Sequence, residues 1–379
     1  MTATPEQIIE ALRPVEDPEL HRSIVDLGMV RDVAVTANGV SLTVVLTVAG
    51  CPMRNEITNR VNAAVVPIAP GGNVSIDFGV MNDEERQRVR VMLNGDPAST
   101  AGSGEAHGHA EGRAIPFAAK DSKTKPLLIS SGKGGVGKSS VTTNLAVALA
   151  AKGFKVGIVD ADIYGFSIPR MLGADRDPVV IDNMLLPPEA HGVRCISIGY
   201  FVPDGEAVIW RGPMLHKALE QFLTDVFWDE PDYLLIDMPP GTGDIALSLS
   251  QYLPKAEVIV VTTPQPAAQK VARLSAAMAK KVNLPVRGVI ENMSWFTGDD
   301  GKRYELFGAG GGKELADELG VPLMAQIPLV AQLREGGDDG QPIAAVAPTS
   351  EAGAAFHVLA DQIAAMRPKR IFSSKLKLG

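Results

Sequence analysis

The feature that most constrains this chain is a glycine-rich segment, Ser131 to Ser140, which reads Ser-Gly-Lys-Gly-Gly-Val-Gly-Lys-Ser-Ser. An apolar run from Pro126 to Ser130 precedes it, and the apolar residues of Val141 to Leu149 follow it at helical spacing. The sequence therefore predicts a buried strand, a glycine loop and a helix in direct succession.

The spacing inside this loop predicts a nucleoside-triphosphate site. Two glycines, Gly132 and Gly137, allow backbone N–H groups to converge on phosphate oxygens, and the start of the helix adds positive dipole. We expect Lys138 to neutralise the β- and γ-phosphates of ATP and Ser139 to ligate Mg²⁺. The alternative is a strand-to-helix turn that binds nothing. The residues expected to contact the nucleotide are Gly132, Lys133, Gly134, Gly135, Val136, Gly137, Lys138, Ser139 and Ser140.

A second lysine, Lys133, lies inside the loop, where its charge requires a partner. The pattern Lys-Gly-Gly-Val-Gly-Lys-Ser resembles the deviant phosphate loop of the MinD, ParA and Mrp ATPases. This resemblance implies a homodimer in which Lys133 reaches the nucleotide of the facing subunit and assists catalysis. A solvated loop lysine is the alternative, because lysines are mostly exposed.

Length and charge narrow the class of protein. The chain has 379 residues, enough for two or three domains, and a net charge of -8, which argues against a nucleic-acid partner. No apolar run reaches membrane-spanning length, and the first residues lack the features of a signal peptide. We therefore expect a cytoplasmic protein without stable membrane association.

The first 93 residues predict a small α+β domain. Strands are expected at Val30–Thr36, Val40–Val48 and Asn73–Val80, with helices after Thr4 and after Cys51-Pro52. A further short helix is expected from Asp83 to Leu93.

Three short motifs in this region, Pro14 to Leu20, Ile24 to Gly28 and Ala49 to Met53, resemble the small domain of bacterial SufT proteins and their eukaryotic counterparts. Those proteins act in iron-sulfur cluster assembly. Cys51 is expected at the start of a helix, where backbone dipoles favour the thiolate, so it is a candidate ligand for iron-sulfur chemistry. A buried, inert cysteine is the alternative.

Residues 94–125 are rich in Gly, Ala, Ser and Pro without apolar periodicity, which predicts a flexible linker. Residues 126–379 then alternate apolar strand-like runs with helix-length segments. This pattern predicts an α/β domain with a doubly wound, mostly parallel sheet, which binds its ligand at the carboxyl ends of the strands.

Several of these strands end in polar residues that suit a nucleotide site. Asp237 precedes a Pro-Pro-Gly-Thr-Gly segment and is expected to hold Mg²⁺. Asp160 and Asp162 follow another strand; we expect Asp160 to support Mg²⁺ and Asp162 to orient the attacking water, although the two roles could be exchanged. Asn292 and Pro328 are expected at the adenine ring, mainly because of the family resemblance.

Five segments in this order closely resemble Mrp (ApbC-type) ATPases, which carry iron-sulfur clusters. They are Lys133 to Ser139, Asp160 to Gly165, Trp210 to Met214, Ile236 to Asp244 and Glu291 to Ser294. The resemblance covers residues 115–370 and implies an ATP-hydrolysing carrier that delivers clusters to apoproteins or works with assembly factors.

One departure concerns the cluster itself. Mrp proteins commonly follow Glu-Asn-Met-Ser with a C-x-x-C pair that holds a cluster between two subunits, but Trp295 to Tyr304 contain no cysteine. Only Cys51 and Cys195 are present, and Cys195 lies in an apolar run. A bound cluster is therefore expected to be labile. A spatial regulator like MinD or ParA, with a basic tail after Met366, and a metal-free ATP switch remain the alternatives.

Overall fold

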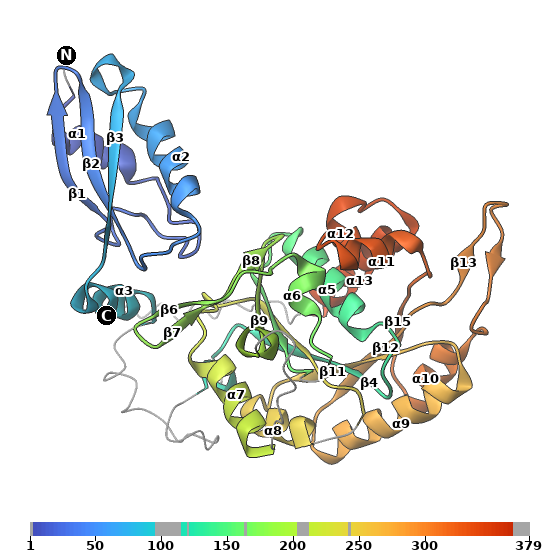
Figure 1. Cartoon of the computed structure of the whole chain (residues 1–379). Helices are drawn as coiled ribbons and strands as arrows, with labels where there is room; N and C mark the ends of the chain where they lie inside the picture. Colours follow the sequence, from blue (N-terminus) through green and yellow to red (C-terminus); the bar gives the residue numbers. More distant parts are fainter. Residues whose placement is uncertain are drawn as a thin grey trace, which may run out of the picture. The chain divides into compact units, whose positions relative to one another are not determined.

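The computed structural model describes residues 3–94, 115–119, 121–162, 165–202, 212–241 and 244–366 (Figure 1). Internal contacts divide the chain into two units, residues 1–104 with 178–186 and residues 105–177 with 187–379. The predicted linker, 94–125, and the basic tail after Met366 lie largely outside the described residues. The domain boundaries stay predictions.

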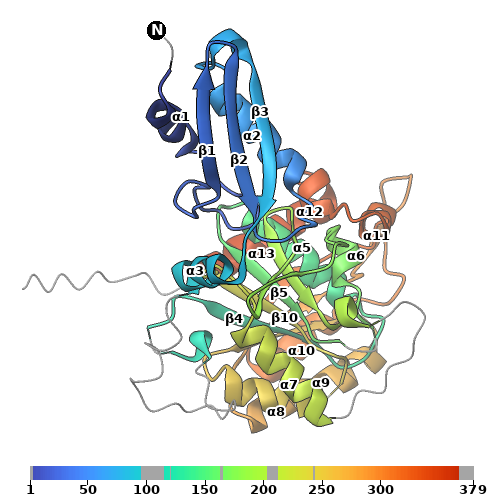
Figure 2. The same cartoon turned by 60° about the vertical axis from the view of Figure 1, so that its left-hand side comes forward.

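The first unit is built on a three-stranded sheet in the order β1-β2-β3. β1 and β2 form an antiparallel hairpin, whereas β3 pairs with β2 in parallel after the crossover helix α2. Helices α1 and α2 contact each other and pack on the sheet (Figure 2). The helices and strands of this unit are α1 (Pro5–Leu12), β1 (Val30–Thr36), β2 (Gly39–Leu46), α2 (Arg54–Val65), β3 (Val74–Val80), α3 (Asp83–Asn94), β6 (Val179–Ile181) and β7 (Met184–Leu186).

Local sequence explains how this unit begins and what it buries. Thr4 accepts a hydrogen bond from the Gln7 amide while the Gln7 side chain accepts one from the Thr4 amide, which forms a complete capping box with Pro5 at the first helical position. The apolar stripes of α1 and α2, represented by Ile8 and Ile57, are fully buried. The fold predicted for residues 1–93 therefore has its core between two helices and one sheet face.

The second unit contains an eight-stranded sheet in the order β15-β12-β11-β4-β10-β5-β9-β8. All neighbouring strands are parallel except β8 and β9. Its strands are β4 (Lys125–Ser131), β5 (Val156–Asp160), β8 (Glu189–Ala190), β9 (Val193–Ser197), β10 (Tyr233–Asp237), β11 (Glu257–Thr262), β12 (Val286–Glu291) and β15 (Leu323–Gln326). The predicted α/β class with a mostly parallel sheet is confirmed.

Helices cover both faces of this sheet (Figure 1). One layer contains α5 (Lys138–Ala150), α6 (Ile168–Leu172), α11 (Ala331–Asp338), α12 (Ile343–Val346) and α13 (Glu351–Ala365). The opposite layer contains α7 (Gly212–Thr224), α8 (Asp244–Tyr252), α9 (Pro266–Lys281) and α10 (Gly311–Leu319). None of the described helices is long and apolar enough to cross a bilayer.

Two-sided coverage explains the apolar strand sequences. Every residue of β5, β9, β10 and β11 is buried, as expected for strands between two helix layers. β4 and β10 lie side by side in parallel, and so do β10 and β5. The loop after β4 and the aspartates that end β5 and β10 therefore meet at one edge of the sheet.

Candidate active site

The glycine loop joins β4 to α5 as the sequence predicts. Gly135 and Gly137 both have a φ of 79°, a left-handed conformation that favours glycine, and Gly137 is the residue from which α5 starts. Gly134 and Gly135 are exposed, and a Cβ added to either would meet no atom within 4 Å. The outer side of the loop is therefore open to a ligand.

Packing also requires glycine at two positions of the loop, Gly132 and Gly137. A Cβ at Gly132 would lie 2.2 Å from the Val271 carbonyl carbon and 2.3 Å from the Ala272 nitrogen, both backbone atoms of α9. A Cβ at Gly137 would lie 2.2 Å from Nδ2 of Asn292. The loop is thus held closely against α9 and against the end of β12.

Lys138 and Ser139 converge on Asp237, the last residue of β10. Lys138 Nζ lies 2.5 Å from Asp237 Oδ2, and Ser139 Oγ donates to the same oxygen at 2.6 Å. Thr142, one helical turn further along α5, donates to Asp237 Oδ1 at 2.6 Å. The carboxylate of Asp237 is fully buried, so these three donors supply the compensation that a buried charge requires.

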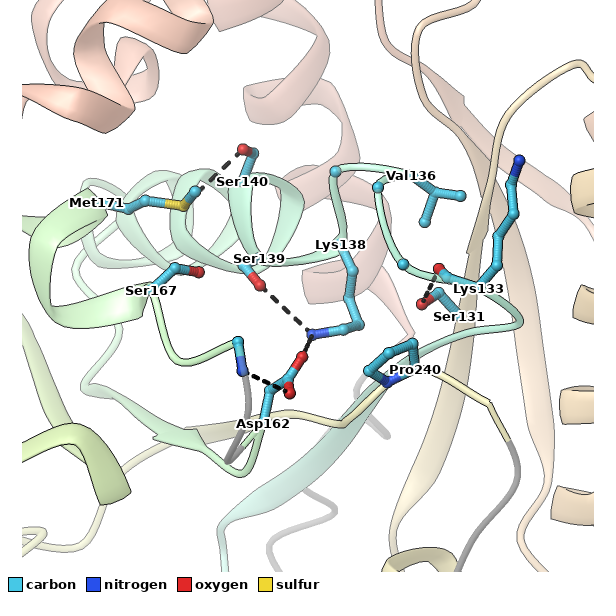
Figure 3. Close-up of a pocket in the computed structure, with 14 residues that line it drawn as sticks. Ser131, Lys133, Val136, Lys138, Ser139, Ser140, Asp162, Ser167, Met171 and Pro240 are labelled. Carbon is cyan, nitrogen blue, oxygen red and sulfur yellow. Dashed lines mark hydrogen bonds and ion pairs between the residues drawn. The ribbon is translucent and has the colours of Figure 1, made fainter. Parts of the chain in front are cut away.

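Asp162 completes this cluster from the segment after β5. Its Oδ2 lies 4.0 Å from Lys138 Nζ, and its Oδ1 accepts a hydrogen bond from the Gly165 amide (Figure 3). The side chain is 13% exposed and faces the same cavity as the loop. Lys138 therefore lies between two carboxylates, and Asp162 is the one in contact with open space.

Asp160 is engaged differently. Its Oδ2 accepts hydrogen bonds from the amides of Ser167 and Ile168 and from the Ser197 hydroxyl, and its Oδ1 accepts one from the Asp162 amide. Burial, together with the nearby charge of Asp237, raises the pKa of Asp160 to about 7 although these backbone donors oppose the rise. The side chain thus fixes the segment that carries Asp162; its role toward Mg²⁺ stays a prediction.

A cavity of about 400 Å³ lies along this edge (Figure 3). Its size falls within the range of small-molecule sites, roughly 300 to 1,000 Å³. The residues that line it are Ser131, Lys133, Gly134, Gly135, Val136, Gly137, Lys138, Ser139, Ser140, Asp162, Gly165, Ser167, Met171 and Pro240. All the predicted loop residues except Gly132 line this cavity.

Lys133 extends away from the cluster around Lys138 (Figure 3). Its Nζ donates to the side chain of Gln265, at the start of α9, across 3.3 Å. Among the described residues of its own chain, the ammonium group therefore contacts a neutral amide. Its predicted role across a dimer stays a prediction.

Asn292 and Pro328 do not line the cavity. The Asn292 amide donates to the Val136 carbonyl oxygen at 2.9 Å, and its own Oδ1 is buried without a hydrogen-bond partner among the described residues. Pro328 is buried next to Ile327. Asn292 therefore supports the phosphate loop from beneath, and contact of either residue with adenine stays a prediction.

Sequence reasoning missed the part played by Glu291. This buried carboxylate accepts hydrogen bonds from Ser294 Oγ at 2.9 Å, from Gln326 Nε2 at 2.7 Å and from the Gly312 amide at 2.5 Å. It thereby joins β12 to β15 and to the start of α10. The Glu-Asn-Met-Ser pattern contained the signal, because a glutamate three residues before a serine is well spaced for a local hydrogen bond.

The segment that lacks the C-x-x-C pair forms a short hairpin, β13 (Phe296–Thr297) with β14 (Arg303–Tyr304). Glu351, at the start of α13, accepts hydrogen bonds from Trp295, Thr297 and Arg303. The Arg303 guanidinium also lies 4.0 Å from the centre of the Trp295 ring. An ion pair and a cation–π contact therefore hold this hairpin.

The two cysteines differ in accessibility. Cys51 is half-buried and directly precedes the turn that leads into α2, as predicted, whereas Cys195 is fully buried in β9. Burial, with the charge of Asp160, raises the pKa of the Cys195 thiol. Among the described residues, no group of three or more His, Cys, Asp or Glu side chains is arranged to hold a metal ion.

Parts of three predicted motifs lie outside the described residues: Ile163-Tyr164, Trp210-Arg211 and Thr242-Gly243. The remaining geometry, a glycine loop with a lysine and a serine on the last aspartate of a neighbouring parallel strand, is typical of P-loop NTPases.

Comparison with known proteins agrees with this geometry. Residues 123–364 match a family described as ParA, NUBPL iron-transfer P-loop NTPase. The chain belongs to this family. Residues 5–78 match a second family, described as an iron-sulfur cluster assembly protein. The resemblance drawn from the motifs is thereby confirmed for both parts of the chain.

Individual relatives match this chain over most of its length. It is 45% identical to a protein of Mycobacterium bovis and 41% identical to one of Synechocystis, both named iron-sulfur cluster carrier protein. The matches cover 94% and 95% of this chain and 92% and 97% of those proteins. A nucleotide-binding protein from Archaeoglobus fulgidus, solved in complex with ADP, is 35% identical over 60% of this chain and 93% of its own, with a TM-score of 0.52.

Proposed function

We propose that this chain binds and hydrolyses ATP at the loop Gly132–Ser140 and uses the nucleotide to control the carriage of iron-sulfur clusters to apoproteins. The observation that carries the proposal is the convergence of Lys138 and Ser139 on the buried carboxylate of Asp237 beside an open glycine loop. Membership of the iron-transfer NTPase family, with carrier proteins as full-length relatives, supports the cluster as cargo. We place this activity in the cytoplasm.

Nucleotide binding must change the contacts that Lys138 makes in this structure. The ammonium group is paired with Asp237, so it must turn from that carboxylate toward the β- and γ-phosphates when ATP enters. The N–H groups of Gly134 to Ser139 supply further donors to the phosphates at the start of α5. Lys138 therefore gives up its ion pair with Asp237 when it binds the phosphates.

Once Lys138 has turned away, the oxygens of Ser139 and Asp237 suit Mg²⁺. Ser139 Oγ and Asp237 Oδ2 are oxygen ligands only 2.6 Å apart, and Mg²⁺ prefers one or two such protein ligands together with phosphate oxygens and water. When bound, Mg²⁺ neutralises charge that develops on the phosphates during transfer. Thr142 keeps the carboxylate oriented through its other oxygen. The oxygens of Asp160 already accept several hydrogen bonds. Asp160 therefore supports the Mg²⁺ site indirectly, by accepting a hydrogen bond from the amide of Asp162.

Asp162 is the residue we assign to the attacking water. It faces the cavity, it is partly exposed, and its backbone amide is fixed by Asp160. A carboxylate held in this way can accept a hydrogen bond from water and orient it toward the γ-phosphorus. Lys133 is assigned to the nucleotide of a second copy, because within its own chain it contacts only Gln265 among the described groups around the loop.

Release of inorganic phosphate from ATP tests the enzymatic part directly. The intact chain is expected to release phosphate only when Mg²⁺ is present, and addition of a chelator should stop it. Phosphate release that proceeds unchanged after Mg²⁺ is removed would contradict the roles given to Ser139 and Asp237.

Replacing Lys133 by Ala is expected to slow hydrolysis by at least about tenfold while ATP affinity changes much less, since this lysine would contribute only across the dimer. Phosphate release and a binding titration, run with sedimentation to determine the oligomeric state, measure the two effects. The matched control is Gln265→Ala, which removes the present partner and should leave the rate near that of the parent. A strict monomer that hydrolyses ATP at the full rate would refute the dimer.

Replacing Cys51 by Ser is expected to lower the iron bound after anaerobic reconstitution without changing ATP hydrolysis. Cys51 is the more accessible of the two thiols, while Cys195 is fully buried and its raised pKa disfavours the ligating thiolate. Cys195→Ser is the matched control and should leave bound iron unchanged. Equal iron in the Cys51→Ser and parent proteins would exclude Cys51 as a ligand, and a parent protein that binds no iron would favour a metal-free ATP switch.

A further inference from the structure

The hairpin formed by β6 and β7 lies within the sequence of the second unit, but its contacts place it in the first unit. Residues 178–186 group with residues 1–104, although residues 105–177 and 187–379 on either side of them form the second unit. Its tight turn at Asp182 and Asn183, with φ values of 44° and 64°, folds β7 back onto β6. Ile181 and Met184, which pair across this hairpin, are almost fully buried.

Within its unit, the hairpin contacts α3. Arg90 NH1 lies 3.0 Å from Asp182 Oδ2, and the two side chains are only 28% and 31% exposed. β6 packs against α3, whose Val89 is also buried. Partial burial makes such an ion pair more specific than a fully exposed one, because fewer alternative partners and less water compete for it.

Both ends of the hairpin lead back to one carboxylate at the nucleotide site. On the amino-terminal side, α6 begins at Ile168, whose amide donates to Asp160 Oδ2. On the carboxyl-terminal side, β9 ends at Ser197, whose hydroxyl donates to the same oxygen. Asp160 is the last residue of β5, in register with Asp237 of β10. Asp160 is therefore hydrogen-bonded to the chain on both sides of the hairpin.

We propose that the β6–β7 hairpin and its ion pair with α3 transmit the nucleotide state of the P-loop site to the amino-terminal unit. Nucleotide binding changes the partners of Asp237 and Lys138, which adjoin Asp160 and Asp162. The hydrogen bonds that Ile168 and Ser197 donate to Asp160 then carry that change toward residues 178–186, and Arg90 receives it. The inference rests on the proposed nucleotide site, and it assigns α3 as the receiving element.

Hydrogen–deuterium exchange of the full chain, with and without saturating Mg²⁺ and ADP, tests this coupling. We expect ADP to slow exchange of the amides of residues 83–94 and 178–186 by about fivefold or more, the lower end of coupling between distinct sites. In Asp182→Arg, which opposes two positive charges, the response of residues 83–94 should disappear while ADP still binds. The double variant Arg90→Asp with Asp182→Arg restores an opposite pair and should restore the response.

A matched control comes from the same helix. Arg88 is 74% exposed and lies 3.9 Å from Glu85, away from the hairpin pair, so Arg88→Asp should leave the response of α3 intact. An unchanged α3 in a parent protein that demonstrably binds ADP would overturn the inference, and so would an undiminished response in Asp182→Arg. Absence of ADP binding in the parent would instead remove the proposed nucleotide site, and this inference with it.

Discussion

Lys138→Ala is expected to lower ATP affinity by at least about a hundredfold and to abolish hydrolysis, while the protein remains folded. The lysine supplies the only side-chain ammonium directed at the described cluster of Asp162 and Asp237, and backbone N–H groups alone cannot replace its charge. The fold survives because Ser139 and Thr142 still donate to Asp237. A binding titration with ATP, phosphate release and circular dichroism measure the three parts of this result.

The control for this variant is Lys133→Ala, which removes a lysine from the same loop but one that contacts Gln265. It should keep most of the ATP affinity that Lys138→Ala loses. A folded Lys138→Ala protein with unchanged ATP affinity would show that the nucleotide binds elsewhere.

Gly132→Ala is expected to destabilise the protein even without nucleotide. The new Cβ would lie 2.2 Å and 2.3 Å from two backbone atoms of α9, which cannot rotate away as a side chain can. Either the loop or the helix must move, at a cost of about 1–3 kcal/mol, equivalent to a Tm about 3–9 °C lower. Thermal unfolding of the ligand-free protein measures the shift.

Gly134→Ala is the matched control, because a Cβ there meets no atom within 4 Å and its φ is not in the left-handed region. Its Tm should stay within about 1 °C of the parent, as for most exposed substitutions. Equal Tm values for the two variants would mean that the loop does not pack on α9 as described.

Much of the second unit could be predicted because its strands have a recognisable sequence pattern. A strand buried on both faces needs a continuous apolar run, and β4, β5, β10 and β11 all have one. The phosphate-binding loop could also be predicted, because glycines at fixed positions before a lysine are typical of a loop whose backbone N–H groups surround phosphates. Asp162 and Asp237 followed from strand ends, where a parallel sheet gathers polar residues.

Other features depend on contacts between distant segments, which local patterns do not encode. The β6–β7 and β13–β14 hairpins have strands of only three and two residues, too short for a period-two pattern to be recognised. Gly132 is read from sequence as a phosphate-binding glycine, yet its closest neighbours belong to α9. Asp160 is read as a strand-end carboxylate and Glu291 is given no role, and only the structure reveals which backbone amides donate hydrogen bonds to them.

The central claim is that this chain carries an iron-sulfur cluster under nucleotide control without a C-x-x-C pair. The most direct test is anaerobic reconstitution with iron and sulfide, followed by iron and sulfide counting and by incubation with an apoprotein acceptor whose activity requires a cluster. We predict a labile cluster that depends on Cys51, is transferred to the acceptor, and is transferred at a different rate when ATP and Mg²⁺ are added. A chain that binds no iron even with the acceptor present, while it still hydrolyses ATP, would contradict the carrier function.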